Sequence, residues 1–242
     1  MKSNIRIVMV NTSHPGNIGA AARAMKTMCL ERLYLVQPVN FPCAEATARA
    51  SGADDVLARA VVCDDLDTAL AGCRWTVGTS ARSRRLEWPL MTPRECAEGL
   101  VKESGEGETA LVFGREDSGL TNEELQRCHH LVHIPTNPGF SSLNLAAAVQ
   151  VLSYEIMLAG EAAPEAAETQ HQVATADEMA SFYDHLEQTL VALQFLDPNH
   201  PRKLMGRLRR LFNRARPDRT EVNILRGMLS AAQGSKLYKS KR

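Results

Sequence analysis

The sequence predicts an α/β fold with a parallel sheet, followed by a small helical domain. Short β-branched runs alternate with segments of helical periodicity between residue 5 and about residue 160, which is typical of repeated βα units. Residues 161–174 are polar or alanine-rich, contain a proline and have no apolar periodicity, which indicates a linker. We therefore expect an α/β domain at 1–160, a linker at 161–174 and a helical extension at 175–242.

The apolar runs predict six strands, at Ile5–Val10, Leu33–Val36, Val61–Asp64, Trp75–Gly78, Leu111–Phe113 and Leu131–Ile134. Helical patterns lie between and after them, at about Asn17–Met28, Glu45–Ala50, Asp67–Ala71, Pro93–Lys102, Asn122–Cys128 and Ser142–Ala159. We expect these helices to cover both faces of the sheet. In the extension, Thr175 and Glu178 form a capping-box pattern, and two more helices follow, one after Pro201 and one from about Glu221.

Composition excludes several classes of protein. Of the 242 residues, 44% are hydrophobic and 23% are charged, which is close to the average of globular proteins and unlike collagen, coiled coils or disordered chains. No apolar run approaches the roughly 18 residues that a membrane span needs, so we expect no membrane association and a cytoplasmic location. The six cysteines form no C-x-x-C pair, and we interpret them as reduced thiols, mostly in the core.

A net charge of zero conceals a strong asymmetry along the chain. Residues 161–198 contain eight acidic residues and no Lys or Arg, whereas residues 199–242 contain 13 basic residues and two acidic ones. A concentrated basic end is typical of proteins that bind nucleic acid or an anionic surface. A solvated helix face is the alternative. We expect outward-facing arginines to bind RNA phosphates, foremost Arg207, Arg209, Arg210 and Arg214.

Three segments, at residues 11–23, 111–121 and 133–145, each contain a polar loop that follows a predicted strand. Open α/β sheets bind ligands at the carboxyl ends of strands, and the amide groups at a helix start favour anions. Taken singly, each loop has an ordinary explanation, such as a solvated arginine at position 23 or a helix cap at Ser141 or Ser142. Three loops of one design at one sheet edge, together with residues 78–82, instead predict a single pocket. The dinucleotide motif G-x-G-x-x-G and the P-loop ending G-K-[ST] are both absent.

These loops resemble the three motifs of the SPOUT class of RNA 2'-O-ribose methyltransferases. The matching segments read N-x-x-x-x-G-N-x-G-A-A-A-R, L-V-F-G-R-E-x-x-G-L and I-P-x-x-x-x-x-S-S-L-N-L. The resemblance covers essentially the whole chain and extends to bacterial tRNA methyltransferases with a helical tail. It implies methylation of cytidine or uridine at nucleotide 32 of the tRNA anticodon loop, a C-terminal trefoil knot in the α/β domain and a homodimer.

The resemblance also implies the methyl donor, S-adenosylmethionine, and the residues that hold it. The donor-binding positions that it implies are Thr79, Ser80, Ala81, Gly114, Ile134, Ser141, Ser142 and Leu143. Arg23 matches the arginine with the central catalytic role, and Asn17, Glu116, Ser142 and Asn144 match positions that support the geometry of ribose or donor. An arginine stays protonated in proteins, so we favour a role for Arg23 in gripping phosphate and stabilising alkoxide charge.

Two short segments and the overall function each allow another interpretation. The segment 128–133 contains one cysteine and three histidines, but strand alternation would separate them on two faces, so we expect no metal site. The run Arg82–Arg85 is either a solvated loop or, through Arg82 and Arg84, an RNA phosphate contact. The rival functions are a non-catalytic RNA-binding protein on the same fold and a small-molecule methyltransferase.

Overall fold

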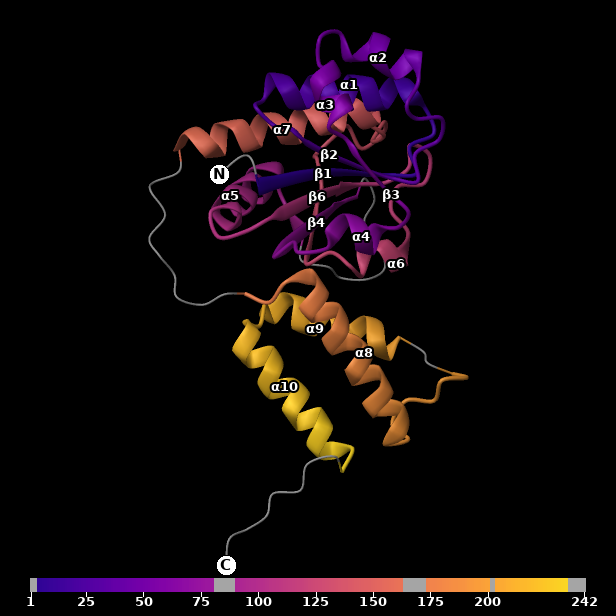
Figure 1. The fold of residues 1–242 in the computed structure, drawn as a ribbon, viewed down its shortest axis with the longest axis vertical. Coiled ribbons are helices and arrows are strands. Elements are labelled where there is room, and N and C mark those ends of the chain that lie inside the picture. Colours follow the sequence, from indigo (N-terminus) through magenta and orange to yellow (C-terminus); the bar gives the residue numbers. More distant parts are fainter. Residues whose placement is uncertain (1–3, 81–89, 163–172, 201–202, 235–242) are drawn as a thin grey trace, which may run out of the picture. The chain divides into compact units, whose positions relative to one another are not determined.

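The computed structural model describes residues 4–80, 90–162, 173–200 and 203–234. The chain divides into two compact units, Met1–Glu168 and Thr169–Arg242 (Figure 1). Of the predicted site residues, Ala81, Arg82 and Arg84 lie outside the described residues.

The first unit is built on a seven-stranded parallel sheet with the order β3-β2-β1-β6-β4-β7-β5. Its strands are β1 (Ile5–Val10), β2 (Arg32–Val36), β3 (Val61–Cys63), β4 (Trp75–Thr79), β5 (Leu90–Met91), β6 (Thr109–Phe113) and β7 (His130–Val132). All six predicted strands are confirmed to within two residues at each end. The two-residue edge strand β5 was not predicted, because so short a run has no periodicity.

Helices cover both faces of this sheet, as predicted. They are α1 (Pro15–Thr27), α2 (Ala44–Ala50), α3 (Asp54–Ala58), α4 (Leu66–Leu70), α5 (Pro93–Ser104), α6 (Asn122–Leu125) and α7 (Leu145–Ala162). In Figure 1, α1 and α7 lie on one side of the strands and α4 and α6 on the other. Alternate residues of β1, namely Ile5, Ile7 and Met9, belong to the core cluster that α1, α5 and α7 complete. The central strands are therefore mostly apolar, since both faces are buried, and the charged Arg6 of β1 is buried with them.

A glycine sets how closely α1 and α2 cross. A Cβ atom on Gly19 would lie 2.0 Å from the backbone oxygen of Ala46, so no side chain fits there unless one helix moves. Gly16, one turn earlier on α1, would instead meet the carboxylate tip of Glu45 at 3.0 Å, and that tip can move aside. The second glycine of the first motif is thus explained by helix packing.

The described residues of the second unit form three helices, α8 (Ala176–Ala192), α9 (Leu204–Ala215) and α10 (Arg219–Ala232). The predicted capping box begins α8: the Glu178 amide donates to the Thr175 hydroxyl at 3.3 Å, and the Thr175 amide donates to the Glu178 carboxylate at 2.9 Å. The core of the unit contains Phe182 and Tyr183, with Phe212 packed edge-on against Phe182. Helix α10 begins two residues before the predicted position, because Asp218 caps it.

None of the six cysteines, all of which are among the described residues, forms a disulfide, and four of them are buried. Burial raises the pKa of Cys96 and Cys128 to about 12, which keeps both thiols protonated and unreactive. None of the helices in the described parts of the chain is long and apolar enough to cross a membrane.

We expect Gly19→Ala to destabilise the protein by about 1–3 kcal/mol, because the new methyl group would overlap the backbone of α2. Gly16→Ala is the matched control on the same helix and should be nearly neutral, because only a flexible side-chain tip must move. Urea unfolding followed by circular dichroism measures both values. Equal stability of the two variants would contradict the close crossing of α1 and α2.

Candidate active site

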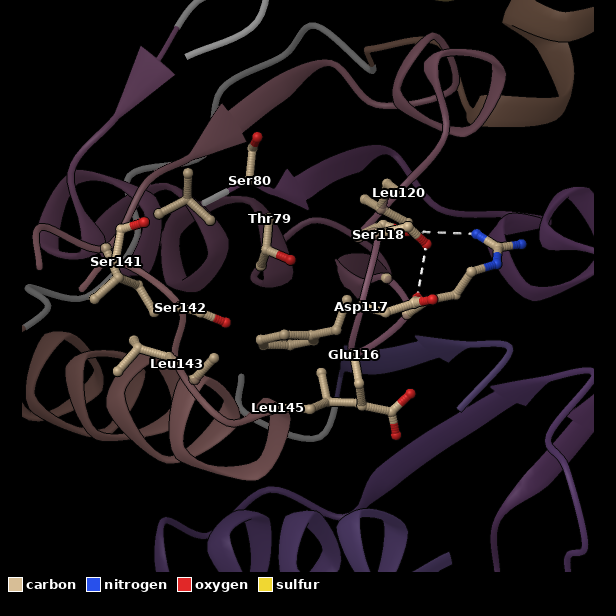
Figure 2. A pocket seen from close by; sticks show the side chains of 17 residues that line it. Thr79, Ser80, Glu116, Asp117, Ser118, Leu120, Ser141, Ser142, Leu143 and Leu145 are labelled. Carbon is tan, nitrogen blue, oxygen red and sulfur yellow. Dashed lines mark hydrogen bonds between the residues drawn. The ribbon is translucent and has the colours of Figure 1, made fainter. Parts of the chain in front are cut away.

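A pocket opens at the carboxyl ends of β4, β6 and β7, where the sequence places it (Figure 2). Seven of the eight predicted donor-binding residues line it: Thr79, Ser80, Gly114, Ile134, Ser141, Ser142 and Leu143. Figure 2 shows Ser141 and Ser142 on one side of the pocket and Glu116, Asp117 and Ser118 on the other. Two loops that are far apart in the sequence therefore face each other across one cavity.

The apolar part of the lining comes from strand ends and from the start of α7. Phe113 and Val132 end β6 and β7, and Leu145 begins α7. Sequence reasoning did not single out these residues, nor Leu120 and Ala148. These residues belong to apolar runs of the sequence. An apolar residue at a strand end is usually part of the core, so the sequence alone does not show that it lines a pocket.

Gly114, which lines the pocket, is also required by the fold of its own loop. A Cβ atom there would lie 2.1 Å from the carbonyl carbon of Gly119 and 2.2 Å from the amide nitrogen of Leu120. The loop folds back on itself through paired backbone hydrogen bonds of Arg115 and Gly119, at 3.2 and 2.9 Å. Gly114 thus makes this turn possible, and the turn forms one wall of the pocket.

The Glu116 carboxylate joins the second motif to the first. Its Oε2 atom accepts hydrogen bonds from the amide and the hydroxyl of Ser13, at 3.1 and 3.0 Å. Its Oε1 atom accepts from the amide of His14 at 3.2 Å and from the side-chain amide of Asn17 at 3.0 Å. Helix starts favour anions because their amides lack partners and the helix dipole is positive there. The sequence suggested a bound anion at the start of α1, and the structure places Glu116 there.

The four donors also control the protonation of Glu116. Partial burial alone would raise the pKa of this carboxyl. The hydrogen bonds from Asn17, Ser13 and His14 outweigh burial and hold the pKa below its ordinary value. Glu116 is therefore charged at neutral pH, and its oxygens are engaged in holding α1.

The third motif joins the same network through Asn17. The Asn144 side-chain amide donates to the Asn17 carbonyl oxygen at 3.0 Å. The Asn144 carbonyl oxygen accepts from the amides of Ala146 and Ala147, at 3.0 and 3.3 Å, which caps the start of α7. Helix α7 begins at Leu145 and not at Ser142, so neither Ser141 nor Ser142 serves as its cap. Both serines are exposed on the pocket loop.

The two motif arginines have contrasting surroundings. Arg115 forms a two-pronged ion pair with Glu124, at 2.9 and 3.0 Å, and also donates to Asn11. The Arg115 guanidinium is thus fully engaged in contacts within the protein. Arg23 is exposed, is absent from the pocket lining, and has no polar side-chain partner among the described residues. It is available to bind an anion.

The histidines near β7 have structural partners. The Nδ1 atom of His129 accepts from the Thr76 amide at 3.0 Å, and the indole nitrogen of Trp75 donates to Nδ1 of His130 at 3.2 Å. Within the parts of the chain that the structure describes, no group of three or more His, Cys, Asp or Glu residues could hold a metal ion.

Comparison with known proteins identifies the family. Residues 4–154 match the SpoU rRNA Methylase family, and residues 177–242 match the C-terminal domain of the tRNA methyltransferase TrmJ. The tRNA (cytidine/uridine-2'-O-)-methyltransferase TrmJ of Klebsiella pneumoniae is 56% identical over 238 residues, which cover 96% of this chain and 98% of the relative. The chain belongs to the TrmJ family. This confirms the resemblance inferred from the three motifs and the class of enzyme that it implies, a tRNA 2'-O-methyltransferase.

Other TrmJ relatives and solved structures agree. TrmJ of Pseudomonas aeruginosa, described as a tRNA (cytidine/uridine/adenosine-2'-O-)-methyltransferase, is 56% identical over 96% of this chain and 95% of the relative. The crystal structure of TrmJ from Z. mobilis matches with a TM-score of 0.82 at 32% identity, covering 93% of this chain and 97% of that chain. AviRb from Streptomyces viridochromogenes, solved with AdoMet, shares the fold over 67% of this chain and 63% of its own at 19% identity, with a TM-score of 0.52.

The lowered pKa of Glu116 predicts a pH-dependent contribution to stability. Its hydrogen bonds stabilise the fold above the unfolded-state pKa of about 4.3 and are lost as the pH falls through the lower folded-state value. We therefore expect Glu116→Gln to lower the free energy of unfolding at pH 7 and to differ far less from the parent at about pH 3. Urea unfolding across this range measures the difference.

The control for this prediction is Glu98→Gln on α5, an exposed glutamate for which no hydrogen bond is seen among the described residues. It should leave the stability unchanged at every pH. A deficit of Glu116→Gln that is the same at both ends of the pH range would show that the carboxylate charge does not hold α1.

Proposed function

We propose that this chain transfers a methyl group from S-adenosylmethionine to the ribose 2'-hydroxyl of cytidine or uridine at nucleotide 32 of the tRNA anticodon loop. The observation that carries the proposal is the network in which Glu116 binds Asn17 and Asn17 binds Asn144, because it joins all three motifs beside one pocket. The choice of cytidine or uridine as the target is supported by the name of the Klebsiella pneumoniae relative, a tRNA (cytidine/uridine-2'-O-)-methyltransferase. The position, nucleotide 32, rests on the family resemblance.

The lining of the pocket suits the donor. Ile134 and Leu143 offer apolar surface for an adenine ring, with the buried Phe113 beneath the lining, and the hydroxyls of Thr79 and Ser142 offer polar contacts at the same cavity. The donor would supply a methyl group on a positively charged sulfur. Thr79, Ser80, Gly114, Ile134, Ser141, Ser142 and Leu143 would hold it, with Ala81 beside them in sequence.

Arg23 has the chemistry that the target needs. A ribose hydroxyl is a weak nucleophile at neutral pH, and negative charge develops on its oxygen as the proton leaves. A guanidinium that is permanently protonated and free of ion pairs can grip the adjacent phosphate and stabilise that charge. Asn17 and Glu116 keep the start of α1 in place, and Ser142 lies at the pocket itself.

Three further parts of the proposal follow from the family. We propose a trefoil knot in the α/β unit, formed where the chain passes through residues 133–145 into α7. A homodimer would place the second chain's basic helices near this pocket, and the exposed side chains of Phe140 and Leu143 on the pocket loop offer apolar surface for such a contact. The enzyme would act in the cytoplasm, on tRNA.

The direct test is transfer of labelled methyl from S-adenosylmethionine to purified tRNA, followed by mass spectrometry of the nucleosides. A 2'-O-methylpyrimidine at nucleotide 32 is the expected product. RNA binding without transfer would support the rival, a non-catalytic RNA-binding protein on the same fold.

We expect Arg23→Ala to abolish methyl transfer, by at least about 100-fold in kcat, while donor binding stays nearly intact. The reason is that Arg23 lies outside the pocket lining and would act on the hydroxyl and the phosphate. Isothermal titration calorimetry measures donor affinity and labelled transfer measures kcat. Arg59→Ala, which removes an exposed arginine paired with Asp55, is the control and should retain activity. Near-normal turnover of Arg23→Ala would remove this residue from catalysis.

We expect a chain that ends at residue 168 to remain folded and to bind the donor, because residues 1–168 form a compact unit of their own. It should lose most of its affinity for tRNA, since the 13 basic residues of the C-terminal segment are removed. Full-length protein should bind tRNA less tightly as salt is added, because binding releases counterions. A truncated chain that methylates tRNA as well as the full chain would refute the role of the extension.

A further inference from the structure

A second pocket lies in the helical unit, beside the connection between α8 and α9. Its lining residues are Phe195, Leu196, Asp197, His200, Lys203, Leu204 and Arg207. An exposed aromatic ring next to Lys and Arg side chains is the combination with which proteins hold single-stranded RNA, because bases stack on rings and phosphates bind cations.

The backbone holds Phe195 in its outward position. Helix α8 is closed by Gln194, whose φ of 57° is in the left-handed region. The amides of Phe195 and Leu196 both donate to the carbonyl of Leu190, at 2.9 and 3.0 Å. Leu196 then turns inward and is 4% exposed, which leaves Phe195 outside with 69% of its surface exposed. The exposure of this ring is therefore fixed by a hydrogen-bonded turn and a buried neighbour.

A line of cations begins at the same place. Lys203, Arg207 and Arg214 are spaced by four and seven residues, so they lie within about 40° of one another around α9. All three are exposed, and no carboxylate in the described parts of the chain pairs with them. Lys203 and Arg207 are about 6 Å apart along the helix axis. Arg209, by contrast, lies with its guanidinium 4.6 Å from the centre of the Tyr183 ring, inside the unit.

One acidic side chain, that of Asp197, also lines the pocket and could repel a phosphate. The carboxylate of Asp197 accepts a hydrogen bond from the Asn199 amide at 2.9 Å and lies 3.2 Å from the His200 ring. It is thus engaged in the turn before α9. Two cations, Lys203 and Arg207, face the pocket against this one carboxylate.

We propose that Phe195 stacks on an unpaired base of the RNA substrate, while Lys203 and Arg207 bind the phosphates beside that base. The inference rests on the proposed function, since it takes tRNA as the substrate, and adds a base-stacking contact in the C-terminal unit. A peptide partner would need apolar surface around the ring. The pocket beside the ring is instead lined mostly by polar side chains, those of Asp197, His200, Lys203 and Arg207, with Leu204 half-buried and Leu196 buried.

The experiment compares three variants of full-length protein, Phe195→Ala, Phe195→Leu and Phe195→Tyr. The matched control is Met228→Ala on α10, which removes an apolar side chain that is 63% exposed and lies outside the pocket. Filter binding at fixed salt gives the dissociation constant for tRNA, and labelled transfer gives KM and kcat. Calorimetric titration with S-adenosylmethionine checks that each variant binds the donor as the parent does. Analytical ultracentrifugation checks that its oligomeric state is unchanged.

Loss of one stacked base should weaken tRNA binding by about 5-fold or more in Phe195→Ala. KM should rise with little change in kcat at saturating tRNA. Phe195→Leu should bind as poorly as Phe195→Ala, and Phe195→Tyr should bind like the parent, because stacking needs a ring. Arg207→Ala should lower the slope of log affinity against log salt by about 0.7, the value for one phosphate of a single strand.

Several results would overturn the inference. Unchanged binding by Phe195→Ala, normal binding by Phe195→Leu, an equal loss in Met228→Ala, or an altered oligomeric state would each exclude a stacked base at this ring. Failure of the proposed function is a separate outcome: RNA binding that depends on the Phe195 ring, in a parent protein that transfers no methyl group, would support this site and refute the methyltransferase.

Discussion

The Glu116 carboxylate is the point at which three distant segments of the chain meet. It lies 103 positions after Ser13 and binds the start of α1 with both oxygens, and its partner Asn17 binds Asn144, 127 positions away. A carboxylate suits this position because it accepts hydrogen bonds at both oxygens, whereas a glutamine would present an amide donor to amides that are themselves donors. The negative charge also matches the positive end of the helix dipole. This contact therefore helps to hold the start of α1, the helix that carries Arg23, in place.

The strand order explains why such a contact can form. Strand β6 lies between β1 and β4, with Leu111 aligned to Ile7 on one side and to Val77 on the other. The loops that leave β1, β4 and β6 therefore emerge side by side at one edge. The short turn at Gly114 keeps the loop after β6 close to the sheet, which brings Glu116 within hydrogen-bond reach of Ser13. Packing of the sheet thus sets the geometry on which the polar network is built.

Most of the fold could be predicted from the sequence because its strands are buried on both faces and its helices carry strong end signals. The run Ile5–Val10 and the Thr175–Glu178 capping box are local patterns, and both are present as predicted. The pocket residues were predicted by their place at strand ends and by family resemblance. Strand β5 and helix α3 were missed, since elements of two and five residues have too little periodicity to detect.

What the sequence could not predict are contacts made across the fold. A Cβ atom on Gly19 would overlap the backbone of α2, and one on Gly114 would overlap the backbone of its own loop at Gly119 and Leu120. Neither close approach can be predicted from a local sequence pattern. Serine and asparagine are equally good helix caps, so the local sequence does not decide between Ser141, Ser142 and Asn144. The start of α7 at Leu145 decides for Asn144, whose side-chain oxygen accepts from the amides of Ala146 and Ala147.

Contacts across the fold also determine which arginines of the helical unit are exposed for phosphate binding. The sequence places Arg207, Arg209, Arg210 and Arg214 together as candidates for phosphate binding. In the folded unit the Arg209 guanidinium covers Tyr183, whose hydroxyl donates to Asn213 at 2.5 Å and whose pKa is raised by burial. Arg207 and Arg214 remain exposed on one face with Lys203. The basic surface of α9 is thus narrower than the arginine count suggests. A narrow line of cations can bind successive phosphates of one RNA strand. The Phe195 ring, at the end of this line, would then stack on an unpaired base of the same strand.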